Sequence, residues 1–174
     1  MRTIAMALLL GIAACSESTA GLEAGAAAGP HGTETTPFAG EWRACQGAPA
    51  PQECSRYQLL QRGSRICGVW SYVASGKAYE GRVIAQAMSP TQARRTHVCG
   101  RPGSETDTAC AAGWQPVDKP LLLCDGRLGD LPDAGGVCHA DYDRVPEAEE
   151  ALDVLASTPW IRACLAGHRV GDGW

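Results

Sequence analysis

The sequence lacks the short motifs that would assign a chemistry directly. Its 174 residues contain no G-x-S-x-G nucleophile motif, no G-x-x-x-x-G-K phosphate-binding loop and no C-x-x-C pair. Cys138-His139 is preceded by Gly135 at the position where covalent haem attachment requires a second cysteine. Structural zinc sites usually take cysteines in close pairs, whereas the closest two cysteines here are Cys45 and Cys54. We therefore expect neither a cofactor nor a metal ion.

Large apolar side chains and clustered positive charges are also scarce. The chain has one phenylalanine against 21 glycines, so a single domain would bury only a thin hydrophobic core. Its 15 lysine and arginine residues are scattered and the formal net charge is −4, which gives no basic patch for nucleic acid. We expect no nucleic-acid partner, and the mild acidity indicates no specific partner of another kind.

One apolar run stands out near the start of the chain. Arg2 is followed by the uninterrupted apolar or small-residue stretch Ile4–Ala14, which at 11 residues is too short for a bilayer span of about 20. No second apolar run of that length follows. A positive charge followed by a short apolar core predicts a secretion signal peptide over residues 1–14.

The end of this run, Ile12-Ala13-Ala14-Cys15, resembles the lipobox of bacterial lipoprotein precursors. The resemblance implies that Cys15 receives lipid, including palmitate, and anchors the exported protein to a membrane. Ser16 follows it where some relatives have aspartate, and by the same resemblance this favours the outer membrane, with the protein facing the periplasm. Ordinary signal cleavage before Cys15 is the alternative, because small residues also precede that bond.

The number of cysteines agrees with export. The chain has nine, and lipidation of Cys15 would leave eight to form four disulfides in an oxidising compartment. Each disulfide would stabilise the domain by roughly 2–4 kcal/mol. We expect a Cys45–Cys54 bridge around a proline-containing loop, and Cys99 and Cys110 flank another loop. The eight disulfide candidates are Cys45, Cys54, Cys67, Cys99, Cys110, Cys124, Cys138 and Cys164.

Composition divides the chain into four parts. After the signal peptide at 1–14, residues 15–37 are rich in Ala, Gly, Ser and Thr and show no periodicity, which predicts a disordered tether behind the lipidated cysteine. A single globular domain is expected over residues 38–168. The remaining residues, 169–174, form a short C-terminal tail.

Alternating and β-branched stretches predict an antiparallel meander. We expect strands near 40–45, 56–61, 65–74, 78–87, 92–99 and 121–124, joined by loops over 46–53 and 100–112 and by turns at 62–64, 75–77 and 125–126. Residues 65–74 are apolar on both faces, which predicts a strand that is covered on both sides or lines a closed barrel. Gly68 and Gly81 are expected at bends or bulges, and residues 128–136 at a loop.

Two short helices are expected at the C-terminal end. Pro146 suits the first position of one helix. Its apolar side chains fall on a single stripe: Ala148, Ala151, Leu152 and Leu155. Thr158-Pro159 begins the second helix, Gly167 ends it, and Cys164 is expected to hold it to the sheet. The predicted fold class is α+β: a small antiparallel β-meander sheet or barrel with two short C-terminal helices, stapled by disulfides.

One turn carries a motif of its own. Ser75-Gly76-Lys77-Ala78-Tyr79 resembles the S-G-x-x-Y loop of bacterial inhibitors of C-type lysozyme. Members of that family include outer-membrane lipoproteins with a small antiparallel β-barrel. In the family this loop enters the lysozyme cleft and its polar groups engage the catalytic acids. The resemblance covers five residues and makes Ser75, Gly76 and Tyr79 a candidate inhibitory loop.

No set of residues predicts catalysis. Ser104 lies in a predicted loop and His97 and His139 are candidate bases, but no spacing links the three. The sequence favours a non-enzymatic, lipid-anchored lipoprotein of the cell envelope, held to the membrane through Cys15, that binds or supports another envelope component such as a protein. The alternatives are a periplasmic lysozyme inhibitor acting through the Ser75–Tyr79 loop, and a hydrolase around His97, Ser104 and His139.

Overall fold

The computed structural model describes residues 35–47, 52–100, 110–131 and 137–170, which belong to one compact unit, Thr33–Trp174. The predicted lipidation site Cys15 and the candidate serine Ser104 lie outside the described residues. None of the described helices is long and apolar enough to cross a membrane.

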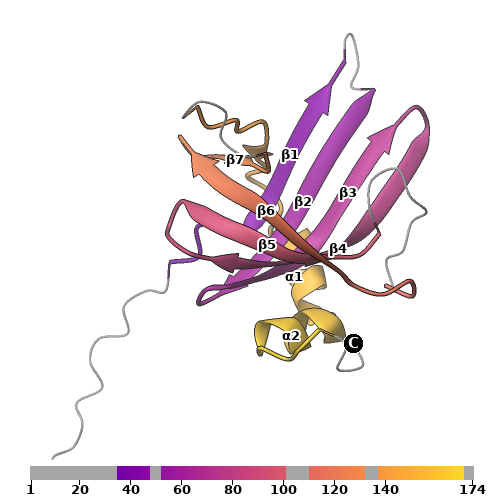
Figure 1. Ribbon diagram of the computed structural model, residues 1–174. Helices are drawn as coiled ribbons and strands as arrows, with labels where there is room; N and C mark the ends of the chain where they lie inside the picture. Colours follow the sequence, from indigo (N-terminus) through magenta and orange to yellow (C-terminus); the bar gives the residue numbers. More distant parts are fainter. Residues whose placement is uncertain (1–34, 48–51, 101–109, 132–136, 171–174) are drawn as a thin grey trace, which may run out of the picture. The chain divides into compact units, whose positions relative to one another are not determined.

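The described residues form one antiparallel sheet that curls into a nearly closed barrel (Figure 1). Neighbouring strands follow the order β7-β6-β5-β4-β3-β2-β1-β8, so β8 returns beside β1. Tyr142, just before β8, pairs with Leu128 of β7 through two backbone hydrogen bonds of 3.0 Å, which joins the two edges of the sheet. The strands are β1 (Gly40–Gln46), β2 (Glu53–Arg62), β3 (Arg65–Ala74), β4 (Lys77–Ala87), β5 (Gln92–Val98), β6 (Gln115–Cys124), β7 (Arg127–Gly129) and β8 (Asp143–Arg144).

The predicted meander is confirmed, with tight turns between its central strands. β3 pairs along its length with both β2 and β4. The turn between β3 and β4 consists of Ser75 and Gly76, whose φ angles are 51° and 73°. A two-residue turn with positive φ at both positions matches the twist of the strands, and glycine adopts such angles without strain.

Two helices cover the outer face of the barrel: α1 (Glu149–Ser157) and α2 (Pro159–Leu165) (Figure 1). The apolar sides of α1 and α2 pack with Cys67 of β3 and Ile84 of β4. The main hydrophobic cluster lies inside the barrel, so β3 is covered on both faces, as its sequence predicted. The first helix begins at Glu149, with Ala148 as N-cap, rather than at the expected Pro146.

Three strand predictions were wrong. β6 begins at Gln115 rather than at Leu121, because Pro116 and Pro120 disguised its first half. Within the described residues β7 pairs with β6 only at Leu122–Cys124, so the first half of β6 has a strand neighbour on one side, where proline is tolerated. β7 lies partly in the loop that was predicted over residues 128–136, and the two-residue β8 was not predicted at all.

The strand pairing shows no bulge at Gly68 or Gly81; both glycines instead lie where another part of the backbone comes close. A Cβ atom on Gly68 would collide with the carbonyl oxygen of Gln58, and one on Gly81 with the carbonyl oxygen of Cys99. Glycine is therefore required where neighbouring backbones press against the strand. The register instead shifts on both sides of β5: Thr96 is the extra residue opposite β4, whereas β6 has two residues, Val117 and Asp118, opposite Thr96.

Four disulfides staple the domain, as the cysteine count predicted. Cys45–Cys54 joins the ends of the β1–β2 connection, and Cys99–Cys110 lies at the β5–β6 connection. The Cys67–Cys164 bridge holds α2 against β3, and the fourth pair links β6 to the segment before β8 through Cys124–Cys138. The bridges thus secure the outer helices and the connections that follow the strands.

Candidate functional site

The barrel interior is filled at one end and hollow at the other. At the filled end, the backbone N–H of Phe38 donates to Oε1 of Gln61 (3.1 Å). The indole N–H of Trp42 donates to the carbonyl oxygen of Phe38 (3.0 Å), and Phe38 is fully buried. We call the opposite end the mouth: it is bordered by the Cys45–Cys54 disulfide, the Ser75-Gly76 turn and the Cys99–Cys110 disulfide.

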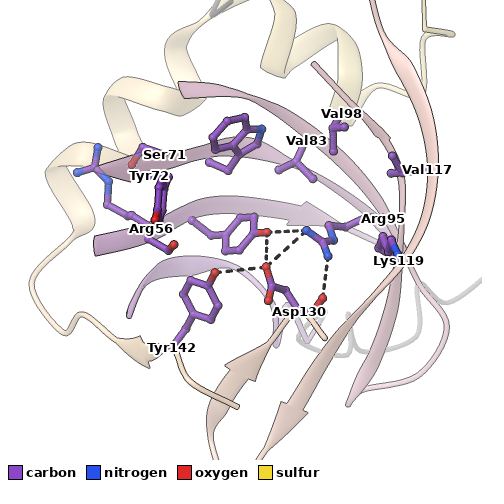
Figure 2. A pocket seen from close by; sticks show the side chains of 13 residues that line it. Arg56, Ser71, Tyr72, Val83, Arg95, Val98, Val117, Lys119, Asp130 and Tyr142 are labelled. Carbon is purple, nitrogen blue, oxygen red and sulfur yellow. Dashed lines mark hydrogen bonds and ion pairs between the residues drawn. The ribbon is translucent and has the colours of Figure 1, made fainter. Parts of the chain in front are cut away.

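A cavity of about 300 Å³ lies in the mouth (Figure 2). Side chains from β2 to β6, together with residues that flank β7 and β8, form its walls. An eight-stranded barrel is just wide enough to be filled by side chains or to hold one small ligand. The rings and aliphatic groups on its walls are Tyr57, Trp70, Tyr72, Val83, Val98, Val117 and Tyr142.

All four tyrosines of the chain lie on this inner surface. Tyr57, Tyr72 and Tyr142 line the cavity, and the ring of Tyr79 packs beside that of Tyr72 with centroids 6.3 Å apart. The rings of Tyr57 and Tyr142 are 5.2 Å apart. Strand alternation explains why Tyr57 and Tyr72 point inward: Tyr57 lies two residues from the core residue Leu59 on β2, and Tyr72 lies two residues from Trp70 on β3. The mouth therefore concentrates the amphipathic rings of a chain that is poor in aromatics.

The bulge at Thr96 determines which β5 side chains face the cavity. In a regular strand, Arg95 and Val98 would point to opposite faces because they are an odd number of residues apart. The extra residue resets the alternation, so both side chains line the cavity. Bulges commonly redirect side chains in this way beside functional sites.

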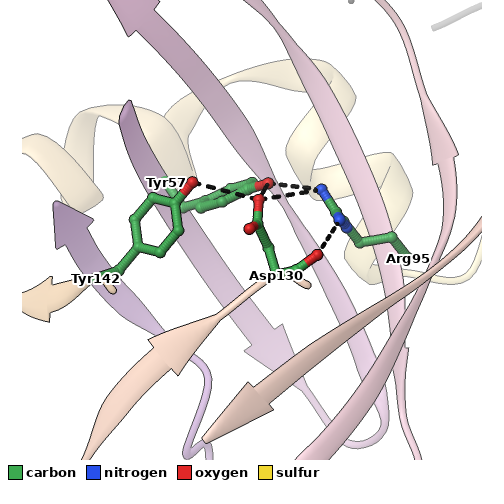
Figure 3. Close-up of polar contacts among 4 residues, drawn as sticks. All are labelled: Tyr57, Arg95, Asp130 and Tyr142. Atoms are coloured by element: carbon green, nitrogen blue, oxygen red, sulfur yellow. Dashed lines mark hydrogen bonds and ion pairs between the residues drawn. The ribbon is translucent and has the colours of Figure 1, made fainter. Parts of the chain in front are cut away.

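Four polar side chains form a network on one wall (Figure 3). Arg95 Nη1 donates to the Tyr57 hydroxyl (2.7 Å), which donates to Asp130 Oδ2 (2.9 Å). The Tyr142 hydroxyl donates to the same Oδ2 (3.3 Å). Arg95 Nη2 donates to the backbone oxygen of Asp130 (2.8 Å), and its Nη1 lies 3.6 Å from Oδ2. The network therefore fixes both charged groups by contacts from three parts of the chain.

Both hydroxyl groups of the network stay protonated at neutral pH. Burial is the main cause that raises the pKa of Tyr57 well above its ordinary value, and the charge of Asp130 adds to it. Burial also raises the pKa of Tyr142, again with a contribution from Asp130. Neither tyrosine is thus poised to lose a proton near pH 7. Their chemical capacity is to donate hydrogen bonds and to present ring surface.

The candidate inhibitory loop lies at the rim of the mouth. Ser75 and Gly76 are exposed at the tip of the β3–β4 hairpin. Tyr79 lies lower on β4, directly opposite Tyr72 in the strand pairing, and is partly buried. The hydroxyl of Tyr72 donates to Oε1 of Glu53 (2.6 Å), so this ring is held from the neighbouring hairpin.

The candidate hydrolase residues do not meet in the described structure. His97 lies on β5 but is absent from the cavity lining; it adjoins Arg65 and His168 near the end of α2. Its Nδ1 lies 3.0 Å from Oγ1 of Thr96. His139 is exposed after the disulfide-bonded Cys138, and Ser104 lies outside the described residues. Within the described residues, no group of three or more His, Cys, Asp and Glu side chains could hold a metal ion.

Comparison with known proteins identified no relative of this chain. No protein-family model matches this chain, and no curated protein or solved structure matches it either.

The sequence reasoning missed the network residues. Tyr57 could have been placed inside the barrel by the alternation of β2. Asp130 and Tyr142 carried no such signal, because the sequence around them has neither regular alternation nor a recognisable motif. Arg94 and Arg95 are adjacent in the sequence, and the bulge at Thr96, which places Arg95 on the same face as Val98, has no sequence signal.

Proposed function

We propose that this protein is a non-enzymatic binding module of the cell envelope, anchored through lipid on Cys15, that takes a small amphipathic molecule into the mouth of its barrel. The observation that carries the proposal is the cavity of about 300 Å³ with ring-lined walls and one preformed polar network. Ligand sites in proteins are typically concave, mainly apolar and supplied with a few fixed polar groups.

The size of the cavity limits the ligand. At roughly 30 Å³ for each water molecule in the liquid, 300 Å³ corresponds to about ten water molecules. A compact organic molecule with about that number of non-hydrogen atoms would fit. A folded protein segment would not, so a protein partner would have to dock on the rim instead.

The polar groups favour binding over catalysis. Arg95, Asp130 and the two tyrosine hydroxyls hydrogen-bond to one another, which holds them in place, and none of them is paired with a base that would activate a nucleophile. Among the described residues that line the cavity there is neither histidine nor cysteine. Groups arranged in this way orient a ligand, and preorganisation lowers the entropic cost of binding it.

Titration with octan-1-ol, a neutral probe of suitable size, tests the proposal. The protein is the ¹⁵N-labelled full chain with Cys15→Ser, which keeps it free of lipid. We expect saturable NMR shifts at mouth residues, including the Trp70 indole N–H. Val117→Trp fills the cavity and should abolish them. Val154→Trp is the matched control, because Val154 is 64% exposed on α1. Absence of saturable shifts in the parent, or unchanged shifts in Val117→Trp, would refute pocket binding.

The anchor is tested separately from the pocket. Metabolic labelling with a radioactive fatty acid should mark the protein in cells, and the Cys15→Ser variant should lose the label. Continued labelling of that variant would contradict the assignment of Cys15. Fractionation of the labelled protein between inner and outer membranes tests the predicted outer-membrane location.

A second candidate function is inhibition of C-type lysozyme through the Ser75–Tyr79 loop. The observation that favours it is the exposed two-residue tip, which projects Ser75 and Gly76 from a rigid hairpin of the kind that can enter a cleft. The test is lysozyme turnover in the presence of excess protein, with Ser75→Ala as the loop variant and Ser157→Ala on α1 as its control. Unchanged lysozyme rates with the parent protein would eliminate this candidate.

A further inference from the structure

We infer that the molecule bound in the mouth is an organic anion: an apolar body with one carboxylate, which Lys119 and Arg95 hold. This inference rests on the proposed function, because it names the ligand class of the same cavity. Three observations support it. The two cations lie opposite each other on adjacent strands; Arg95 has a carboxylate partner whereas Lys119 has none among the described ion pairs; and Arg95 already contacts the ring and the carboxylate that would attract a cationic ligand.

The two cations are direct cross-strand neighbours. Arg95 of β5 pairs with Lys119 of β6, and both side chains line the cavity (Figure 2). Residues directly opposite in antiparallel strands have Cβ atoms roughly 5 Å apart, and like charges there destabilise the sheet. An anion bound between Arg95 and Lys119 would offset this repulsion, so the pair of cations favours a negatively charged ligand.

Their charges are not equally compensated. Arg95 is paired with Asp130, and the two side chains are only 14% and 22% exposed. Among the ion pairs of the described residues, none includes Lys119. The side chains of Arg95 and Lys119 thus bring two cations to the cavity against the single carboxylate of Asp130. The ligand that completes this balance is negative.

A cationic ligand is disfavoured because the protein's own guanidinium already occupies the groups that would attract it. The guanidinium carbon of Arg95 lies 6.0 Å from the centre of the Tyr57 ring. Oδ2 of Asp130 already accepts hydrogen bonds from two tyrosine hydroxyls. A second cation would have to compete with Arg95 for the same ring and the same carboxylate.

The rest of the wall suits an apolar body. The indole N–H of Trp70 donates to the carbonyl oxygen of Cys99 (3.2 Å), so the ring offers carbon surface to the cavity. Val83 and Val98 face each other across β4 and β5 and extend that surface. An aliphatic chain or a single ring would cover it while its carboxylate reached Lys119.

The test compares probes that share one alkyl chain and differ in head group. Octanoate, octan-1-ol and octylammonium are titrated into the full chain with Cys15→Ser at pH 7, and dissociation constants are taken from NMR shifts. Hydrogen bonds to charged groups predict that octanoate binds about tenfold more tightly than octan-1-ol, with octylammonium weakest. Rising salt should weaken the binding of octanoate alone. Titration of 3-phenylpropanoate shows whether the preferred body is aliphatic or aromatic.

Matched variants separate this inference from the proposed function. Lys119→Gln should reduce octanoate affinity about fivefold or more and leave octan-1-ol affinity unchanged. The control is Arg94→Gln, which also removes one positive charge. Arg94 precedes Arg95 on β5 and forms an ion pair with exposed Asp118 outside the cavity, so this variant should change neither the octanoate affinity nor the octan-1-ol affinity. Equal binding of octanoate and octan-1-ol would overturn the anion inference and leave pocket binding intact, as would equal effects of the two variants. Failure of every probe to bind would overturn both.

Discussion

Tyr57 and Tyr142 offer two chemically identical substitutions inside one hydrogen-bonded network, with different expected costs. Tyrosine to phenylalanine removes only the hydroxyl oxygen, so the ring packing that both residues contribute to the barrel is retained. Both side chains are buried, at 5% and 8% exposure. Any difference between the two variants therefore reports on the hydrogen bonds that each hydroxyl makes.

The geometry predicts a cost about three times larger for Tyr57→Phe. Its hydroxyl makes two hydrogen bonds, of 2.7 and 2.9 Å, and both partners are charged. Such bonds contribute about 1.5–3 kcal/mol each, and since Arg95 and Asp130 keep other partners, we take the lower end, about 3 kcal/mol in total. The Tyr142 hydroxyl donates one longer bond to charged Asp130, of 3.3 Å, and its other partner, the Ser55 side chain, is neutral, so we expect a smaller loss of about 1 kcal/mol.

Urea unfolding of both variants at pH 7, followed by circular dichroism, measures these losses in free energy of unfolding. Equal losses, or a larger loss for Tyr142→Phe, would refute the assignment of Tyr57 as the centre of the network. A double variant extends the test: because both hydroxyls share Asp130 as a partner, the two losses should not add.

The same network predicts how stability responds to alkaline pH. The pKa values of Tyr57 and Tyr142 are raised in the folded protein, mainly by burial. Below pH 10 both states keep these protons and the contribution is constant. Above pH 10 the unfolded chain releases them while the folded protein does not, so stability falls by up to about 1.4 kcal/mol per pH unit for each tyrosine. Tyr57→Phe should reduce the measured slope by up to about 1.4 kcal/mol per pH unit.

Three further predictions concern the frame of the barrel. Replacing Cys67 and Cys164 by alanine removes a disulfide that closes a loop of 97 residues. The lost loop-closure entropy should lower the free energy of unfolding by about 4–5 kcal/mol, which urea unfolding measures. Gly81→Ala forces a methyl group into the carbonyl oxygen of Cys99 and should cost more than about 2 kcal/mol in the same assay. The pKa of His97 is lowered, first by burial and then by a nearby arginine. Stability should therefore fall as pH drops below about 6.5, where only the unfolded chain gains the proton, and His97→Gln should remove that slope.

The sequence predicted the central strands and the helices because each has a local cause. Alternation and tight turns predict β2, β3 and β4. Apolar residues on both faces of β3 predicted that other parts of the chain would pack against both of its faces. Thr158-Pro159 and Gly167 bound the second helix as expected. Even the Cys45–Cys54 and Cys99–Cys110 bridges follow from short loops whose ends must meet.

Barrel closure has no local cause and could not be predicted in the same way. It depends on Leu128 and Tyr142, which pair as an isolated bridge between very short strands. Two or three residues carry no periodicity, so nothing in the sequence indicated that the end of the sheet would return to β1. The choice between an open sheet and a barrel was therefore left undecided until the long-range pairing was seen.

The candidate site depends on that closure more than on any motif. Tyr57 comes from β2, Arg95 from a bulge in β5, and Asp130 and Tyr142 flank the strands that close the barrel. In an open sheet, Asp130 would lie far from Tyr57 and Arg95. In the closed barrel, Arg95 is largely buried, and without this carboxylate it would be an unpaired buried cation, which costs several kcal/mol. The charge pair and the closing bridge thus require each other. An Asp130→Ala variant should accordingly loosen the mouth as well as destabilise the chain, and hydrogen exchange at Leu128 and Tyr142 would report it.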